Sequence, residues 1–311
     1  MRILEYDDVD PMEVLQVNLL ALDFALTPER ALQIRQTDPR PFPFFAVCAE
    51  KGGRVVGHVG VFRLPFISTE GREDVGGVWA VSVHPEYSNR GVASRLLDEA
   101  HTRMRAAGLR LSTLGTGRYR VAYKLYQQHG YEDTQVLGTA LARWETAHQP
   151  TRLRALHPGP EGFDFVDNLF AQVAGEYLGF AWRFTPFTPI REKVSLEDVW
   201  ILWQNARPAG YALAHQKRTL LHISSLCLSI EISIVEAIAA VASQVKSDYV
   251  RVDASRPVEF ESLLQAGWRV ARPSWSAFMV KSLVPVLSVE GARHLFGIGT
   301  DRFLISWLDM T

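Results

Sequence analysis

The order of predicted elements repeats in the two halves of this 311-residue chain, and this repetition limits the fold more than any other feature. Each half shows a hairpin, a strand, a helix, a strand, a second helix and a final extended segment. Gly53 and Gly210 fall in equivalent hairpin turns, and Gly130 and Gly267 end equivalent helices. A period of about 140 residues is too long for a solenoid repeat, so the pattern predicts two tandem domains.

Apolar periodicity and turn residues place the elements of both halves. In the first half we predict strands at 2–6, 44–49, 54–62, 78–83 and 109–114, helices at 11–22, from 28, from 92 to before Gly108 and at 119–129, and an extended segment at 131–144. In the second half we predict helices at 163–178, 232–245 and 258–266, strands at 199–205, 209–215, 219–226 and 249–253, and an extended segment at 268–284. Prolines between 150 and 160 indicate a linker, and the tail from 285 adds a short helix and a last strand at 303–308. The expected fold is α/β (an α+β mixed sheet), with domains at 1–150 and 151–311.

Composition and charge exclude several classes of protein. Hydrophobic residues make up 47% and charged residues 22% of the chain, the balance of a soluble globular protein. A formal charge of −1 argues against a nucleic-acid partner. No apolar run reaches the ~18 residues that span a bilayer, and the first residues are acidic where a secretory signal is basic. We therefore expect a cytoplasmic protein with no membrane partner, and the two cysteines, Cys48 and Cys227, form neither a disulfide framework nor a metal site.

The segment from Val78 to Leu97 carries the strongest chemical signal. An apolar strand leads through a short turn into a helix, whose first N–H groups lack intrahelical partners and lie at the positive end of the helix dipole. Gly91 allows a ligand to approach the backbone, and Ala93 keeps the first helical turn small. This pattern predicts pyrophosphate binding, although a glycine in such a turn is also a common structural device. The arginines that could add charge are Arg90, Arg95, Arg118 and Arg120.

Tyr126 carries the second signal, on the helix that follows the next strand. It lies one turn before the glycine at position 130, and Ala122, Leu125 and His129 share or adjoin its face. A tyrosine in this position is most often part of the core, and that alternative stays open.

Together the two segments resemble the GNAT acyltransferase superfamily. Its pattern [Gln/Arg]-x-x-Gly-x-[Gly/Ala] falls on Ser88-Asn89-Arg90-Gly91-Val92-Ala93, and Leu-Tyr-x-x-x-Gly-[Phe/Tyr] falls on 125–131. The resemblance covers about residues 1–145 well and residues 151–284 weakly. Tandem halves of this kind are similar to the mycothiol synthase family and to the core of the enhanced intracellular survival acetyltransferases.

The resemblance implies an N-acetyltransferase with acetyl-CoA as cosubstrate and a primary amine of a small molecule or peptide as acceptor, attacking directly. The residues whose backbone would contact acetyl-CoA are Val81, Ser82 and Val83 along the pantetheine arm, and Asn89, Arg90, Gly91, Val92, Ala93 and Ser94 around the pyrophosphate. Tyr126 would protonate the departing thiolate, because a phenol of pKa ~10 and a thiol of pKa ~8.5 are roughly matched.

Three positions depart from the family pattern. Ser88 replaces the usual glutamine or arginine, and Tyr119 stands where many members place an asparagine that contacts pantetheine. Gly77 stands where histone-type members carry a glutamate base, so the general base is unassigned. The carboxylates and imidazole nearby belong to Glu73, Asp74 and His84, and the family analogy adds the terminal carboxylate of Thr311.

The second half lacks the features of a coenzyme site. The counterpart of the phosphate turn, residues 226–233, has no glycine or arginine, and Glu231 would repel phosphate. Leu263 aligns with Tyr126. We therefore predict that this half binds no CoA and supports the active half or shapes the acceptor pocket. A non-catalytic acyl-CoA sensor and a tandem-domain scaffold remain the alternatives, and a homodimer is left open.

Overall fold

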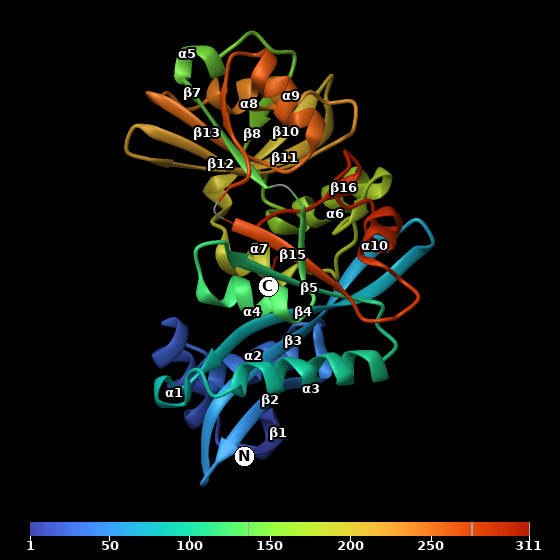
Figure 1. Cartoon of the computed structure of the whole chain (residues 1–311). Helices are drawn as coiled ribbons and strands as arrows, with labels where there is room; N and C mark the ends of the chain where they lie inside the picture. Colours follow the sequence, from blue (N-terminus) through green and yellow to red (C-terminus); the bar gives the residue numbers. More distant parts are fainter. Residues whose placement is uncertain (136, 275, 311) are drawn as a thin grey trace.

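Two mixed β-sheets organise the chain, as the sequence predicts (Figure 1). In the computed structural model, which describes residues 1–135, 137–274 and 276–310, the first sheet has the strand order β1-β2-β3-β4-β5-β15-β6. The second sheet has the order β14-β7-β13-β12-β11-β10-β8. Along these two paths only β4–β5 and β12–β13 are parallel pairs, so each sheet contains one crossover through a helix.

The first sheet and the helices around it come mostly from the first half of the chain. Its strands are β1 (Arg2–Glu5), β2 (Pro41–Lys51), β3 (Arg54–Ser68), β4 (Gly71–Val83), β5 (Leu111–Gly117), β6 (Glu132–Gln135) and β15 (Ser276–Ser282), and the short strands β9 (Leu178–Gly179) and β16 (Phe303–Leu304) join it at β3. Its helices are α1 (Pro11–Leu22), α2 (Pro28–Thr37), α3 (Val92–Ala106), α4 (Val121–Gln128) and α10 (Val289–Phe296), with 3-10 turns at Tyr6–Asp8 and Pro85–Tyr87.

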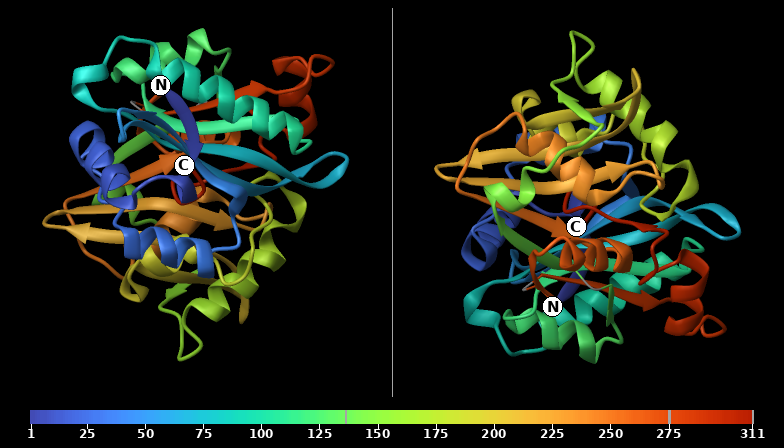
Figure 2. Two further views of the ribbon diagram at one scale, coloured as in Figure 1. Left: turned by 90° about the horizontal axis from the view of Figure 1, so that it is seen from below. Right: turned by 90° about the horizontal axis from the view of Figure 1, so that it is seen from above.

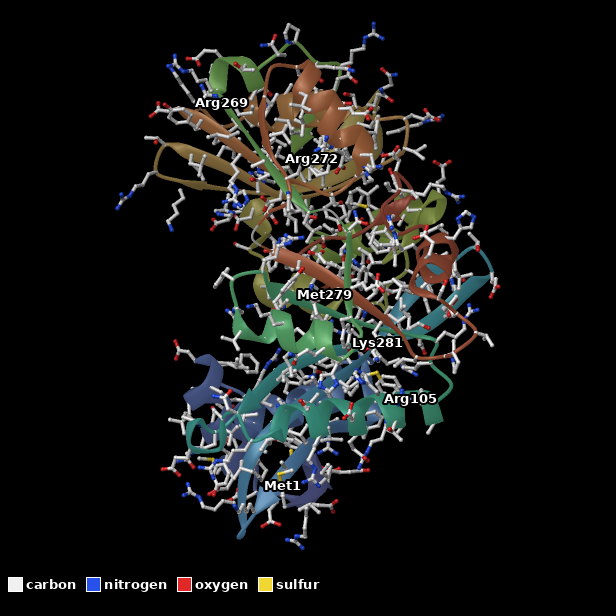
Figure 3. The ribbon with its side chains drawn as sticks, viewed as in Figure 1. Met1, Arg105, Arg269, Arg272, Met279 and Lys281 are labelled. Carbon is white, nitrogen blue, oxygen red and sulfur yellow. The ribbon has the colours of Figure 1, made fainter. Side chains whose placement is uncertain are left out.

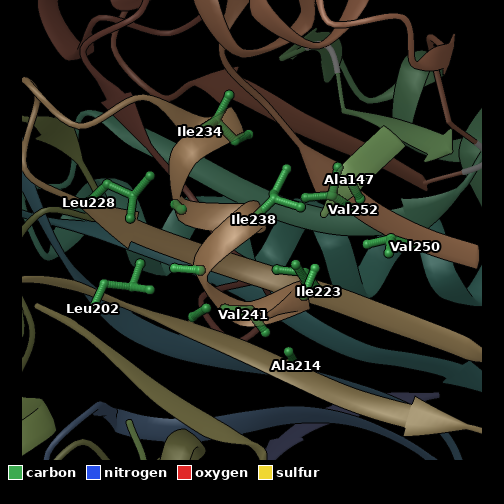
Figure 4. Close-up of a cluster of buried hydrophobic side chains, with 14 of the residues drawn as sticks. Ala147, Leu202, Ala214, Ile223, Leu228, Ile234, Ile238, Val241, Val250 and Val252 are labelled. Carbon is green, nitrogen blue, oxygen red and sulfur yellow. The ribbon is translucent and has the colours of Figure 1, made fainter. Parts of the chain in front are cut away.

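The second sheet has the same general organisation. Its strands are β7 (Gly138–Arg143), β8 (Arg154–Leu156), β10 (Val199–Gln204), β11 (Arg207–Lys217), β12 (Leu220–Leu228), β13 (Tyr249–Ala254) and β14 (Arg269–Ala271). Its helices are α5 (Trp144–Ala147), α6 (Phe163–Val173), α7 (Thr188–Lys193), α8 (Ile234–Ala242) and α9 (Pro257–Gln265), with 3-10 turns at Ala174–Glu176 and Leu196–Asp198. In Figure 4, Ile234, Ile238 and Val241 of α8 project into the apolar cluster that fills one face of this sheet.

Helix α3 packs unusually close to the first sheet, and this contact positions the predicted phosphate turn. Its buried stripe consists of Val92, Leu96, Leu97, Ala100, His101 and Met104. A Cβ on Gly57 would lie 2.8 Å from Val92 Cγ1, and one on Gly76 would lie 2.4 Å from Met104 Sδ. The two glycines therefore let the helix approach β3 and β4 more closely than any side chain would allow. Figures 1 and 2 show α3 on the outer side of the sheet, away from the second half.

The two sheets exchange one strand each. Strand β7 follows β6 along the chain but pairs with β13, so that 138–143 lie opposite 249–254. Strand β15 crosses in the other direction and pairs with β5 over seven residues. The run β4-β5-β15-β6 consequently matches β12-β13-β7-β14 strand for strand. The domain boundary at residue 150 stays a prediction, but the sheets themselves do not separate there, because β7 and β15 each belong to the sheet of the other half.

Four sequence expectations for the second half are wrong in detail. The hairpin turn predicted at Gly210 lies at Asn205 and Ala206, and Gly210 is inside β11, where it pairs with both neighbouring strands. The linker predicted at 150–160 contains β8, which pairs with β10. The helix predicted at 163–178 ends at Val173, and β9 follows it because Leu178 and Gly179 pair with the tail strand β16. The tail strand itself spans only Phe303–Leu304 and not 303–308. Within the part of the chain that the structure describes, no helix combines the length and apolarity needed to cross a bilayer.

Candidate active site

Strands β4 and β5 diverge and leave a wedge in the first sheet. Their paired positions are confined to Gly76–Ser112 and Gly77–Thr113, although β4 continues to Val83 and β5 to Gly117. The edge of β4 beyond Gly77 therefore lacks a β5 partner over the segment that contains Val81, Ser82 and Val83. Backbone groups at such an edge can pair with an extended ligand in the manner of an added strand.

The turn after β4 leads into an uncapped helix N-terminus. Gly91 is the N-cap of α3 at φ 74°, and Asn89 also has a positive φ of 58°. No side chain caps the helix, and its first turn contains no acidic residue. Asn89, Arg90 and Gly91 are exposed, Ala93 and Ser94 are half-buried, and the side chain of Val92 anchors the turn in the core. The first N–H groups of α3 thus have no side-chain cap, which is the arrangement that favours an anion, and pyrophosphate binding at this turn stays a prediction.

The four candidate arginines divide into two groups. Arg90 and Arg95 are exposed beside the turn, and the Arg90 guanidinium lies 5.5 Å from the Tyr87 ring. Arg120 is exposed at the start of α4. The expectation for Arg118 is wrong, because its guanidinium forms an ion pair with Asp133 at 2.6 Å and donates to two carbonyl groups at the start of β15. It joins the strands of the first sheet instead of facing phosphate.

Tyr126 lies in the same hydrophobic cluster as the wedge and the phosphate turn. This cluster includes Val81, Val83, Val92 and Tyr131. The Tyr126 side chain is buried, with its ring 5.9 Å from that of Tyr131 in an edge-to-face contact. Burial raises the pKa of Tyr126 to about 12, against the smaller opposing effect of Arg120. The phenol is therefore protonated at every physiological pH, but it is a weaker acid than the reference phenol pKa of ~10 used in the sequence analysis implies.

The remaining predicted residues take varied positions. Tyr119 is 69% exposed, and its ring covers the backbone of Gly117 at the end of β5. Among the candidate bases, Glu73 is held by Arg110 at 2.6 Å, and His84 accepts a hydrogen bond from the Glu86 amide. Asp74 lies 3.7 Å from Arg63, and burial raises its pKa. Thr311 lies outside the described residues.

A β-bulge on β4 lies beside the wedge, and sequence reasoning missed the side chains that hold it. His58 lies opposite Ser82 and Gly60 opposite Trp79, so the single residue Val59 of β3 faces both Ala80 and Val81 of β4. His58 Nδ1 lies 2.9 Å from the Ala80 carbonyl oxygen. Two residues further along β4, the Ser82 hydroxyl donates to Asn18 Oδ1 of α1 at 3.0 Å. Nothing in the local pattern of β3 distinguishes His58 from an ordinary strand residue.

A cavity of about 810 Å³ lies between the second sheet, the edge of the first and the C-terminal tail. It occupies the place where β12 and β13 diverge, which is equivalent to the β4–β5 wedge. Its polar lining residues include Arg118, Ser224, Ser225, Arg251, Asp253, Ser255, Glu259, Arg269, Ser274 and Ser306. Arg269 is labelled in Figure 3, on the upper sheet. Met310 of the tail also lines the cavity and packs on the cluster that includes Trp79 of β4.

One group of side chains offers ligand atoms of the kind that bind metals. Asp98, His101 and His129 place such atoms within 4.8 Å of one another. Burial lowers the pKa of His101 to about 3, and the positive charges of Lys281 and Arg105 act in the same direction. Figure 3 shows Lys281 on β15 and Arg105 near the end of α3. These cations disfavour a metal ion, and His101 instead bonds with the Tyr131 hydroxyl at 2.9 Å.

The equivalent turn of the second half differs in charge. Helix α8 begins after Ser233, again without a side-chain cap, but its first turn carries Glu236, and Glu231 is exposed in the preceding turn. Carboxylates at a helix N-terminus occupy the field that would attract phosphate. The absence of CoA binding in this half stays a prediction.

The sequence of residues 14–131 matches the model of the acetyltransferase (GNAT) family. No curated protein matches the sequence.

Solved structures extend the similarity to almost the whole chain. A protein from Enterococcus faecalis described as a probable N-acyltransferase has a TM-score of 0.73 and 14% identity, covering 91% of this chain and 72% of that one. A GCN5-related N-acetyltransferase from Anabaena variabilis gives 0.66 and 15%, covering 91% and 73%. Eis1 from Mycobacterium abscessus gives 0.61 and 14%, covering 92% and 75%. Residues 14–131 therefore resemble the acetyltransferase (GNAT) family in sequence, and the chain as a whole shares the fold of these solved structures.

Proposed function

We propose that the protein is an N-acetyltransferase that transfers the acetyl group of acetyl-CoA to a primary amine of a small molecule or peptide. The observation that carries this proposal is the junction of the β4–β5 wedge with the uncapped N-terminus of α3. The wedge offers backbone groups to the pantetheine arm, and the helix offers N–H groups to the diphosphate. The backbone groups of the wedge and the N–H groups of the helix carry no net charge, so the dipole of α3 supplies the attraction to the diphosphate.

The chemistry proceeds by direct attack. The amine nitrogen forms a bond to the thioester carbonyl carbon, the C–S bond breaks, and the amine loses one proton to solvent. The departing thiolate accepts a hydrogen bond from the Tyr126 hydroxyl and takes its proton from water, without complete transfer from the phenol. Because the pKa of Tyr126 is about 12 and that of a thiol is ~8.5, complete transfer is unfavourable, and the phenol acts mainly by donating a hydrogen bond to the sulfur as charge develops.

The 810 Å³ cavity suits the acceptor better than the coenzyme. Its volume falls in the range of small-molecule sites, and its lining combines serine hydroxyls with side chains of both charges. Such a surface favours a polar amine over a lipophilic one. Met310 lines the cavity and packs against the same hydrophobic cluster as Trp79 of the bulged strand, which supports a role for the cavity in holding the acceptor.

The test is release of thiol from acetyl-CoA with a panel of amines, comparing the wild type with Tyr126→Phe. Loss of a general acid lowers rates by about 10²–10⁴-fold, and the raised pKa places our expectation at the lower end, about 10² in kcat. Tyr123→Phe is the matched control, because Tyr123 lies on the same helix and its hydroxyl contacts Asp133 at 3.3 Å.

The outcomes separate the competing functions. Unchanged turnover in Tyr126→Phe would remove Tyr126 from its role. Tight binding of acetyl-CoA without turnover by any amine would favour a sensor, and failure to bind it would leave a scaffold.

A further inference from the structure

We propose that His58 is a positioning residue for acetyl transfer, which acts through Nδ1 by fixing the Ala80 carbonyl and with it the bulge of β4. This inference rests on the proposed function. It concerns a side chain of β3 that lies on the side of the sheet opposite α3 and belongs to none of the family motifs in the sequence.

The hydrogen-bond geometry fixes the state of the imidazole. A carbonyl oxygen only accepts, so Nδ1 at 2.9 Å from Ala80 O carries the hydrogen. The side chain is completely buried, and burial lowers the pKa of His58 to about 4, so the ring is neutral. Nε2 is therefore a bare lone pair, and it has no hydrogen-bond partner among the residues that the structure describes.

The bulge needs such support. Ala80 has φ 47°, a left-handed conformation that strains a residue with a Cβ. The register irregularity lies in the stretch of β4 that faces the wedge, where the proposed function places the acyl group of the coenzyme. The hydrogen bond from His58 stabilises this conformation from the side of β3. Two residues further along β4, the hydrogen bond of Ser82 to Asn18 anchors the strand to α1.

Surrounding side chains keep the imidazole in place. The Trp79 ring meets it edge to face at 5.8 Å and covers Gly60 so closely that a Cβ there would lie 2.2 Å from Trp79 Nε1. A side chain at position 60 would displace Trp79 and release His58. The orientation of the β4 backbone thus depends on packing from β3 as well as on the bulge itself.

A role for His58 as the general base is disfavoured by the same environment. Accepting the proton of the attacking amine would leave an imidazolium in a fully buried site, where burial lowers the pKa of the ring and no carboxylate raises it. Nε2 is nevertheless the atom that would accept the proton if His58 were the base, because it carries the lone pair. The two roles therefore assign activity to different nitrogens of one ring.

Two amide substitutions test the roles of the two ring nitrogens separately. His58→Asn keeps an N–H donor near the position of Nδ1 and removes Nε2, whereas His58→Gln places its amide near Nε2 and removes the donor to Ala80. Asparagine is one methylene group smaller than glutamine, so His58→Asn leaves the larger cavity, and a smaller loss of kcat in that variant could not be attributed to better packing. We expect His58→Asn to keep kcat within about threefold of the wild type, and His58→Gln to lose about 10–100-fold in kcat, the range that follows from a misplacement near 1 Å.

A backbone variant supplies a second readout. Ala80→Gly removes the strain of the left-handed conformation, so it should restore part of the kcat that His58→Gln loses, without a matching change in KM for the acceptor. If His58 had only a structural role, adding Ala80→Gly to His58→Gln would restore no kcat when the single and double variants are compared at equal stability.

The outcomes are distinct from those for the proposed function. If the wild type turns over but the Asn and Gln variants lose kcat equally, the positioning role of Nδ1 is overturned. Retained activity in His58→Gln with loss in His58→Asn would overturn it in favour of Nε2 as a base. A wild type that binds acetyl-CoA but transfers no acetyl group would overturn the proposed function, and the inference about His58 with it.

Discussion

Replacing Gly91 by alanine tests the predicted diphosphate site, and the chain provides a control for the effect on stability. Gly91 and Gly108 flank the two ends of α3, with φ of 74° and 79°. A Cβ at either position would meet no atom within 4 Å. Each substitution therefore costs only the strain of a left-handed alanine, about 1 kcal/mol, which lowers Tm by about 2–4 °C.

The two variants should differ in coenzyme binding. At Gly91 the added methyl group enters the space where we place the diphosphate, whereas Gly108 lies at the far end of the helix. Loss of one hydrogen bond to a charged group weakens binding by about 1.5–3 kcal/mol, or about 10–150-fold in Kd. Calorimetric titration of CoA into Gly91→Ala, Gly108→Ala and wild type measures this difference.

A truncated substrate sharpens the result. S-acetyl-pantetheine lacks the diphosphate, so its KM should be the same in Gly91→Ala as in the wild type. The reasoning fails if both alanine variants bind CoA equally well, or if S-acetyl-pantetheine suffers the same loss as acetyl-CoA in Gly91→Ala.

Two further predictions concern stability. Asp309→Ala leaves the buried Arg183 guanidinium without the carboxylate that it contacts at 2.8 Å, so the free energy of unfolding measured in urea should fall by about 3–5 kcal/mol. The double variant Arg183→Met/Asp309→Leu removes both charges and should regain most of this stability. An equal fall in the two variants would contradict our explanation, which attributes the loss to an unpaired buried charge. The pKa of His58 is about 4 in the folded protein and ~6.5 when unfolded, so the unfolded chain binds more protons below pH 6.5 and stability falls as pH falls from there towards 4. Between pH 7 and 5 this histidine accounts for about 2 kcal/mol of the wild-type loss, and His58→Asn should show a correspondingly smaller loss over the same interval.

The sequence predicted the local backbone structure around the candidate site, because that structure depends on neighbouring residues. Gly91 lies in the turn before α3, α3 begins at Val92 as its apolar stripe indicates, and Tyr126 lies on a helix that packs beside them. The error at Arg118 arose because sequence distance gave no sign of Asp133 or of the carbonyl groups of β15. The raised pKa of Tyr126 was likewise out of reach, because desolvation depends on which elements cover the ring.

The amino-acid order alone determined the strand–turn–helix units, because backbone φ preferences, helix caps and apolar periodicity act over a few neighbouring residues. Only the tertiary structure decided which sheet receives β7 and which receives β15, since both wedges present a free strand edge and both strands carry apolar residues that can fill either. It also decided the contact of His58 with Ala80, 22 residues away, and of Arg183 with Asp309, 126 residues away. Such pairings depend on the free energy of packing the whole core, so no single segment of the sequence is enough to predict them.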